Sequence, residues 1–355
     1  MDPISQAYIS LEALIGVVSI LGNMFVLLAI YKNYTLQTPT NCFIASLAIA
    51  DMLVGIIVAP LAALSYLGLP HNFLGCVFTN SCVIMLTQIS IFSLVAVAGE
   101  SFLAIKNPFL YQKRMTMKTA IIINVVTWIF AILIGFIPLF GWNLGDSGDP
   151  NWTCSFTNVI DMKYMVCFNF FICILLPLFV MFGVYTYIFL IVRKQMIQIA
   201  SLEITSLNYN GDSRRTSRKF KKEIKAAKSL AIVIGLFALC WIPLHILNTL
   251  TFFCGTNCPY PYKLLLATIL LSHANSAINP FLYAYGNSNF KVALKKMLGI
   301  KLNVRDIETS VAKSVNSWKK CTDNINSGKT SNIKATNNQV NNNQNIYSIQ
   351  SSSII

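Results

Sequence analysis

Residues 93–108 read SLVAVAGESFLAIKNP and end an apolar run that begins at residue 76. That run is longer than the roughly 20 apolar residues that an α-helix needs to cross a bilayer. A single acid, Glu100, lies near its end, and a Lys-Asn-Pro sequence closes it. The first element that the sequence predicts is therefore a membrane-spanning helix that carries an acid close to one end.

Six more runs of this kind occur in the 355 residues, of which 55% are hydrophobic and 11% charged, with a mean hydropathy of +0.60. A soluble domain carries about 25% charged residues. Each run must be helical, because lipid offers the backbone no hydrogen-bond partner. We predict an all-α membrane protein, a bundle of seven spans at residues 10–31, 41–67, 76–105, 118–140, 163–192, 226–253 and 262–285.

The basic residues indicate how the bundle is oriented. With the N-terminus outside, 25 of the 27 Lys and Arg fall on the inner side, as the positive-inside rule requires. The net charge of +14 then needs no nucleic acid; it fits a cytoplasmic face against anionic lipid and a cytosolic partner. The first ten residues lack the basic region of a signal peptide, so the first span is expected to direct insertion.

Four segments follow from this topology. Residues 1–9 are predicted to be an extracellular N-terminus and residues 10–287 the seven-helix bundle. Residues 288–299 place apolar and Lys residues on opposite faces, which is typical of a short interfacial helix. Residues 300–355 are rich in Asn and Ser, which predicts a disordered cytoplasmic tail.

Polar residues within spans are costly and mark candidate sites. One set comes from spans 1, 2, 3 and 7 at similar depth: Asn23, Asp51, Ser90, Asn275 and Asn279. One carboxylate among amide and hydroxyl oxygens suits a small hard cation such as sodium. A hydrogen-bonded polar core with internal water is the alternative.

A second set lies on the sixth span, where Trp241, Leu244, His245 and Asn248 follow the i, i+3, i+4, i+7 spacing of one helical face. An Asn amide offers a donor and an acceptor side by side, which complements the edge of adenine. A hydrogen bond between two helices is the alternative interpretation of Asn248.

Cysteines and one glycosylation motif mark the outer side. Cys76, Cys154, Cys254 and Cys258 fall at outer ends or loops, where disulfides persist. Asn151 begins an Asn-Trp-Thr acceptor sequence in an outer loop.

The sequence resembles the rhodopsin-like G-protein-coupled receptors through GN at 22–23, SLAIAD at 46–51, CWIP at 240–243 and NPFLY at 279–283. Within that family it resembles the adenosine receptors, through LLSHANSAINPFLYAY at 270–285, FGWN at 140–143 and CSF at 154–156.

This resemblance implies roles for individual residues. Asn248 would bind adenine, Phe156 would stack on it, and Leu244 and Met165 would form apolar walls. Ribose would meet Thr87, Ser272 and His273, with Glu12 orienting His273, and His245 and Trp241 would complete the pocket. Cys76–Cys154 and Cys254–Cys258 would be disulfides. Thr157 stands where some members have Glu.

The inner end of the third span departs from the family, which has Asp-Arg-Tyr where this chain has Glu100, Ser101 and Phe102. The family Arg is expected to bond its neighbouring acid and the acid at the foot of the sixth helix, Glu223 in this chain, and then, in the active state, to contact the G protein. Ser can do neither. We expect Glu100 to pair with Lys106 or another base of the second inner loop, or to extend to the headgroups. Weakened coupling is favoured over raised basal activity.

The predicted function is that of a plasma-membrane receptor for adenosine or a related nucleoside, acting through an inhibitory-type heterotrimeric G protein. A non-signalling nucleoside binder, or a dimer partner for another receptor, is the alternative. A transporter or channel is less favoured, because no internal repeat or matching broken helices occur. No catalytic group is suggested, and the predicted ligands other than the nucleoside are a sodium ion and membrane lipid.

Overall fold

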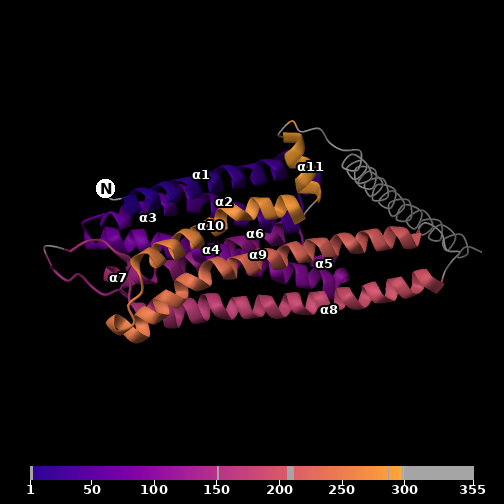
Figure 1. The fold of residues 1–355 in the computed structure, drawn as a ribbon. Helices are drawn as coiled ribbons and strands as arrows, with labels where there is room; N and C mark the ends of the chain where they lie inside the picture. Colours follow the sequence, from indigo (N-terminus) through magenta and orange to yellow (C-terminus); the bar gives the residue numbers. More distant parts are fainter. Residues whose placement is uncertain (1–2, 150–151, 206–211, 287, 298, 300–355) are drawn as a thin grey trace, which may run out of the picture. The chain divides into compact units, whose positions relative to one another are not determined.

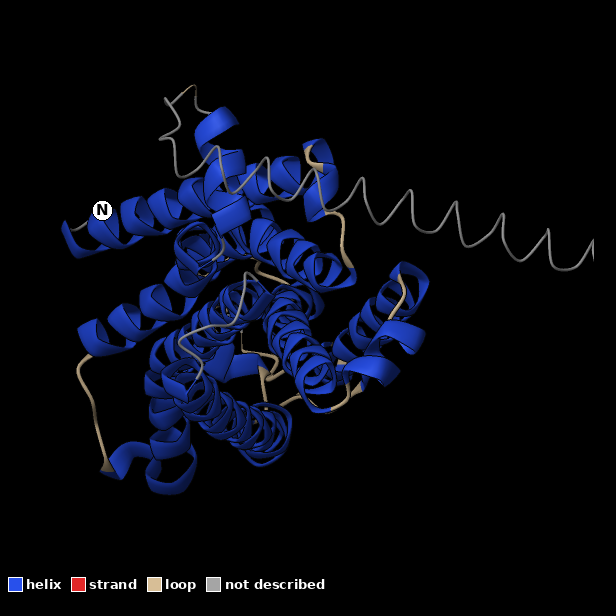
Figure 2. Cartoon of the chain, turned by 90° about the vertical axis from the view of Figure 1, so that its right-hand side faces the viewer, coloured by secondary structure: helices blue, strands red, loops and turns tan. Residues whose placement is uncertain are grey.

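The computed structural model describes residues 3–149, 152–205, 212–286, 288–297 and 299, of which 192, 195–205, 212–230, 256, 285–286 and 288–289 are described by their backbone only. The described residues are almost entirely helical, and they contain seven helical segments long and apolar enough to cross a membrane. Figure 2 shows helices and loops and, in the part of the chain described, no strand. The predicted all-α fold with seven spans is confirmed.

The chain forms helices of very different lengths, from short surface turns to full membrane spans. In chain order they are α1 (Pro3–Lys32), α2 (Pro39–Leu53), a π-helical segment η2 (Val54–Val58), α3 (Ala59–Tyr66), α4 (Phe73–Lys106), α5 (Pro108–Arg114), α6 (Met117–Gly135), α7 (Phe156–Val159), a π-helical segment η4 (Lys163–Leu175), α8 (Leu176–Thr205), α9 (Asp212–Cys254), α10 (Tyr262–Gly286) and α11 (Ser288–Met297). Short 3₁₀ turns lie at Tyr34–Leu36, Ile137–Phe140 and Gly255–Asn257.

The long helices pack side by side as a closed bundle. Neighbours in contact are α1 with α2, α2 with α4, α4 with α8, α8 with α9, α9 with α10, and α10 with α1, while α6 packs on α2 and α4. In Figure 1, α7 and the N-terminal end of α1 lie at one end of the bundle, and α5 and α11 lie at the other. The chain therefore brings residues far apart in sequence to the same level between the helices.

Two prolines explain the π-helical segments. The residue before Pro60, Ala59, donates its backbone N–H to Val54, five residues back. Leu176, before Pro177, likewise donates to Phe171. Proline has no N–H and its ring clashes with the carbonyl four residues back, so a wider turn accommodates the ring without breaking the helix. Both spans therefore continue through their prolines.

Several helix limits differ from the predicted span limits, and the first and fourth spans show why. The first helix begins at Pro3 rather than residue 10, so most of the segment predicted as an N-terminal extension is helical; Pro is well suited to a first helical position. The fourth span ends at Gly135, and residues Ile137–Phe140 form a 3₁₀ turn that contains Pro138. Apolar composition runs past both limits and cannot locate them.

The short helix predicted at residues 288–299 is α11. Phe290 and Ala293 are buried against the bundle, and Phe290 packs near Tyr283 with ring centroids 6.2 Å apart. Lys291 and Lys296 are exposed, which fits the predicted division into an apolar and a basic face. Residues 300–355, predicted to be a tail, lie outside the described residues.

Candidate functional site

A cavity of about 270 Å³ lies between the helices beside α7. Helices α1, α3, α4, α7, α9 and α10 and segment η4 all contribute to its wall. The structure brings nine of the ten predicted ligand-binding residues to this wall: Thr87, Phe156, Met165, Trp241, Leu244, His245, Asn248, Ser272 and His273. The tenth, Glu12, does not line the cavity, but its carboxylate contacts the cavity residue His273.

The helical stripe predicted on the sixth span faces this cavity as a whole, since its four residues all line it. Asn248 is 8% exposed, and its side-chain amide makes no hydrogen bond within the part of the chain whose side chains are described. Among the residues whose side chains are described, Asn248 therefore does not form the hydrogen bond between two helices that the sequence left open. The amide keeps its donor and its acceptor for a ligand.

His245 lies one turn below and is 1% exposed. Its ring stacks on Phe170 with centroids 4.6 Å apart and planes 7° apart, and neither ring nitrogen has a partner among the described residues. A buried polar group without a partner costs free energy, so this imidazole is suited to a ligand's polar group. The Trp241 ring packs with its centroid 6.2 Å from that of the same imidazole.

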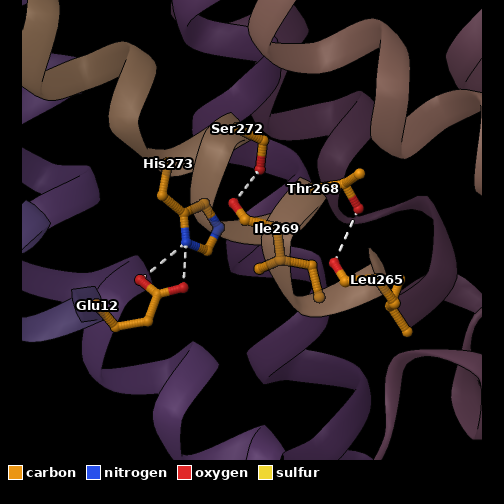
Figure 3. Close-up of polar contacts among 6 residues, drawn as sticks. All are labelled: Glu12, Leu265, Thr268, Ile269, Ser272 and His273. Atoms are coloured by element: carbon orange, nitrogen blue, oxygen red, sulfur yellow. Dashed lines mark hydrogen bonds and ion pairs between the residues drawn. The ribbon is translucent and has the colours of Figure 1, made fainter. Parts of the chain in front are cut away.

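Two hydroxyl groups face the cavity from opposite helices. Thr87 Oγ1 donates to the Val83 carbonyl at 2.9 Å, and Ser272 Oγ donates to the Ile269 carbonyl at 2.7 Å (the latter in Figure 3). Each hydroxyl has one hydrogen and two acceptor lone pairs. Because the hydrogen is used within the helix, both oxygens present acceptors to the cavity, which matches a ligand with hydroxyl donors.

Glu12 holds His273 in place, as Figure 3 shows. The Nδ1 atom of His273 lies 2.9 and 3.0 Å from the two carboxylate oxygens of Glu12, and both residues are buried. A carboxylate on one ring nitrogen fixes the orientation of the imidazole. The other ring nitrogen, Nε2, is thereby left for the cavity.

Sequence reasoning missed three tyrosines that line the cavity. The rings of Tyr8 and Tyr66 are 4.8 Å apart, and those of Tyr66 and Tyr262 are 6.4 Å apart; all three line the cavity. Tyr8 lies four residues before Glu12, so helical spacing from a predicted residue could have found it. Tyr66 and Tyr262 had no such signal, because each ends or begins a span.

The described wall of the cavity has polar groups but no carboxylate, ammonium or guanidinium group. Among the described residues that line the cavity, none is Asp, Glu, Lys or Arg. Its polar groups are hydroxyls, amides and two imidazoles. A cavity of this kind favours an uncharged ligand, because it offers no counter-charge to replace lost hydration.

A second buried polar cluster lies around Asp51, which is 0% exposed. Asn279 donates to Asp51 Oδ2 at 2.7 Å, and Asn23 donates to the Ser19 and Ser276 carbonyls at 2.9 and 3.0 Å. Several oxygens have no partner among the described residues: Asn23 Oδ1, Asp51 Oδ1, Ser90 Oγ and Asn279 Oδ1. Asn275, the remaining member of the predicted set, is buried on α10.

The loop that leads into α7 is fixed beside the cavity by covalent and apolar contacts. Cys76 is joined to Cys154, with Cα atoms 5.6 Å apart, and Cys254 is joined to Cys258. Phe156, two residues after Cys154, packs against the apolar cluster that contains Cys76 and Cys154. The structure thus contains both pairings that the resemblance implied, and the first holds Phe156 at the cavity. Asn151, the predicted glycosylation acceptor, lies outside the described residues.

Comparison with known proteins gives one consistent answer. Residues 22–283 match the 7 transmembrane receptor (rhodopsin family). The chain is 43% identical over 316 residues to adenosine receptor A2b of Gallus gallus, covering 84% of this chain and 90% of that receptor. It is 41% identical over 305 residues to adenosine receptor A2a of Homo sapiens, covering 83% and 72%.

The chain belongs to the adenosine receptor family. The predicted family is therefore confirmed. Its members are signalling receptors and not enzymes, and this adenosine-receptor homologue is a multi-pass protein of the plasma membrane.

The end of the adenosine-receptor homologue near α5 is organised around Glu100, which is 4% exposed. Its Oε1 accepts hydrogen bonds from Thr40 Oγ1 at 2.5 Å and from the Tyr111 hydroxyl at 2.6 Å. Ser101 Oγ lies 3.5 Å from Oε2. Burial and the hydrogen bond to Glu100 raise the pKa of Tyr111 to about 12, so this phenol stays a donor at physiological pH.

These contacts correct both predictions made for Glu100. Among the residues whose side chains are described, it pairs with no Lys or Arg, and its burial shows that it does not extend to the headgroups. The Lys106 ammonium lies instead 5.0 Å from the centre of the Phe102 ring. The hydroxyl donors come from α2 and α5, and the residue spacing along one helix could not predict contacts from other helices. Glu223 lies in α9, where the structure describes the backbone alone.

Proposed function

We propose that this protein is a cell-surface receptor for adenosine that signals through a heterotrimeric G protein. The observation that carries the proposal is an uncharged cavity with an unpaired Asn248 amide on one wall and the acceptor oxygens of Thr87 and Ser272 on others, within the part of the chain that the structure describes. The name of the relatives, adenosine receptor, supports the same ligand.

Asn248 and Phe156 support the proposal that the cavity binds the purine ring of the nucleoside. The exocyclic amine of adenine donates and its N7 accepts, and an amide can meet both at once. Phe156 supplies an aromatic face for the purine, worth about 0.5–1.5 kcal/mol beyond burial. Leu244 and Met165 supply apolar walls beside it.

Thr87, Ser272 and His273 support the proposal that the cavity binds the ribose of the nucleoside. The first two present acceptors for ribose hydroxyls, and His273, oriented by Glu12, adds a ring nitrogen. Since the described wall residues include no Lys or Arg, a phosphate would meet no permanently charged partner. The proposal is therefore a nucleoside rather than a nucleotide.

Competition binding on membranes of cells that express the chain tests this proposal. Adenosine should bind, AMP should bind far more weakly, and Asn248→Ala should weaken adenosine binding about 5- to 150-fold, the effect of losing a bidentate contact of about 1–3 kcal/mol. Thr186→Ala, on the exposed side of α8 and outside the cavity, is the matched control. Surface expression without any adenosine binding would refute the proposal.

An allosteric sodium ion at Asp51 is part of the same proposal. Unpaired oxygens from Asp51, Ser90 and Asn279 support it, because sodium prefers such hard oxygen ligands. When bound, the ion would supply a counter-charge to the buried carboxylate. Water in a polar core is the alternative, and sodium titration of agonist binding separates the two, since water alone gives no specific effect of sodium over potassium.

Coupling is the finer part of the proposal. We infer that Ser101 weakens G-protein activation, because the side chain is short, uncharged and beside an acid that already has two hydroxyl donors. The inhibitory class of G protein stays a prediction. Cyclic-AMP measurement tests it, since an inhibitory G protein lowers the signal and a stimulatory one raises it. Binding without any G-protein response would favour the non-signalling alternative.

The extracellular N-terminus, lipid contacts and a receptor dimer also stay predictions. The orientation is supported by the 25 of 27 Lys and Arg on the inner side. An epitope tag before residue 3 that antibodies reach on intact cells is the expected result.

A further inference from the structure

The loop between α5 and α6 carries an exposed hydroxyl group among basic residues. Residues 113–118 read KRMTMK, so Lys113 and Arg114 stand three and two positions before Thr116, and Lys118 stands two positions after it. All four side chains are exposed. No residue from 101 to 145 is Asp or Glu. The loop therefore presents the Thr116 hydroxyl beside positive charge that no acid of the same stretch balances.

This loop lies at the end of the bundle where Figure 1 shows α5 and α11. With the N-terminus outside, as proposed above, that end faces the cytosol, where ATP and protein kinases occur. The positive-inside rule accounts for the basic residues of the loop, but it does not account for a hydroxyl group at this spacing from them. The inference that follows goes beyond the receptor function and rests on the proposed orientation.

Thr116 lies in the short non-helical connection between the two helices. Met115 has φ −86° and ψ 85°, and Thr116 has φ −99° and ψ 167°. Phosphoryl transfer requires the attacking oxygen to lie in line with the terminal phosphorus of ATP and its leaving oxygen. An exposed side chain on an extended backbone can reach that position inside a kinase cleft without unfolding of a membrane span.

The neighbouring Thr119 differs from Thr116 in each of these respects. It lies within α6 and is half-buried, and its Oγ1 donates to the Arg114 carbonyl at 3.0 Å. Thr116 Oγ1 lies 3.0 Å from Thr119 Oγ1 and accepts the Thr119 backbone N–H at 3.2 Å. The contacts of the Thr116 hydroxyl are thus made at the exposed surface, and a kinase can displace them locally.

The basic residues before Thr116 determine which class of kinase would recognise it. Lys and Arg side chains form charge-assisted hydrogen bonds with carboxylates, and the forked guanidinium of Arg can bond a carboxylate through two N–H groups. Within the part of the chain whose side chains are described, neither Lys113 nor Arg114 forms an ion pair. Both are therefore available to a kinase whose substrate groove is acidic.

We propose that Thr116 is a phosphorylation site for a serine/threonine protein kinase that prefers basic substrates. Thr116 Oγ1 attacks the terminal phosphorus of ATP, and the bond between Oγ1 and phosphorus forms. The bond from that phosphorus to the bridging oxygen breaks, ADP leaves with the electron pair, and a base of the kinase takes the hydroxyl proton. The phosphate adds a charge of about −1.5 to −2 to the loop.

The fold accommodates the phosphorylated side chain. Thr116 is the N-cap of α6, and negative charge is favourable beside the first turn of a helix. Arg114 and Lys118 flank the modified residue. The four Lys and Arg of residues 101–118 give this stretch a charge of +4, which phosphorylation lowers to about +2. The modification therefore weakens the attraction of the loop for anionic lipid.

The test is phosphorylation of the purified full-length chain by the catalytic subunit of a cyclic-AMP-dependent protein kinase, with ATP labelled at its terminal phosphate. The same basic spacing precedes Ser217 and Thr322, so the starting chain carries Ser217→Ala and Thr322→Ala. Thr116→Asn is added to remove the hydroxyl while keeping a good N-cap residue. Thr116→Ser keeps the hydroxyl, and Thr119→Ala is the matched control that removes the neighbouring one.

The starting chain, Thr116→Ser and Thr119→Ala should take up label at residue 116, located by mass spectrometry, and Thr116→Asn should take up none. Arg114→Gln should slow labelling about tenfold or more, because a charge-assisted contact with the kinase is lost. Absence of phosphate on Thr116 while the kinase labels a reference peptide, or label that Thr116→Asn leaves unchanged, would overturn the inference.

Two further measurements separate this inference from the proposals on which the receptor function depends. In cells, kinase and ATP added from outside should label Thr116 only after the plasma membrane is permeabilised, and labelling of intact cells would overturn the orientation and the inference with it. Adenosine binding is measured on the same purified chain. Because Thr116 does not line the cavity, loss of labelling with binding retained overturns the phosphorylation site alone.

Discussion

Substitution of Ser101 by Arg tests the inner end of the receptor most directly. Glu100 Oε1 is occupied by Thr40 and Tyr111 at 2.5 and 2.6 Å. Among the described side chains, its Oε2 has only Ser101 Oγ at 3.5 Å, outside the usual range of about 2.5–3.0 Å for such bonds. The guanidinium introduced by Ser101→Arg should therefore bond this carboxylate oxygen without displacing an existing donor.

The expected size of the effect follows from that available oxygen. A hydrogen bond to a charged group contributes about 1.5–3 kcal/mol, which corresponds to a shift of about 10- to 150-fold between receptor states. The same Arg provides the planar, permanently charged group that the G protein is expected to contact. We expect lower basal and higher agonist-stimulated activity.

The assay is G-protein activation with and without adenosine, alongside ligand binding on the same membranes. Ser101→Ala should resemble wild type, because the bond it removes from Glu100 is long. Ser101→Lys should give a smaller gain, since an ammonium lacks the forked geometry of Arg. Unchanged basal and stimulated activity in Ser101→Arg, with normal surface expression, would refute the reasoning.

Three further predictions address other contacts. Tyr111→Phe removes one donor from buried Glu100 and should lower the free energy of unfolding by about 1–3 kcal/mol, measured through a shift in Tm. Because the raised pKa keeps Tyr111 protonated, its contact with Glu100 is fully present below a pH of about 10 and is lost only as the pH rises toward about 12. Glu12→Gln should weaken adenosine binding by about 1–3 kcal/mol, because the His273 ring loses its carboxylate partner, and a Kd equal to wild type would contradict this role. Asp51→Asn should abolish any effect of sodium on agonist binding, and a retained effect would contradict an ion at that carboxylate.

Much of the fold could be predicted because lipid leaves few choices. Apolar length fixed the existence of each span, and helices were the only way to pair the backbone. Limits were less certain where hydrophobicity continued past the helix, as at Pro3 and Gly135. The π-helical turns before Pro60 and Pro177 depend on how each ring was accommodated, and sequence offered several ways to do that.

Whether a part of the site could be predicted from the sequence depends on whether its residues lie on one helix. The stripe from Trp241 to Asn248 followed from helical spacing, and the structure places all of it on the cavity. Contacts between helices were not accessible in the same way. The Thr40–Glu100–Tyr111 cluster joins three elements, so an acid without its expected Arg was assigned a basic partner when hydroxyls were already in reach.

Helix α4 carries a residue of the cavity and a residue proposed to act in coupling, and the two lie far apart along the helix. Thr87 and Ser101 lie on the same helix, and at 1.5 Å per residue they are about 20 Å apart. The part of the bundle around the cavity presents donors, acceptors and aromatic faces, whereas the part around Glu100, in the residues described, has no basic side chain paired with that acid. A change confined to the inner end need not alter the cavity, so adenosine affinity alone cannot report whether the receptor signals. Only binding and activation measured on the same protein distinguish a weakly coupled receptor from a silent nucleoside binder.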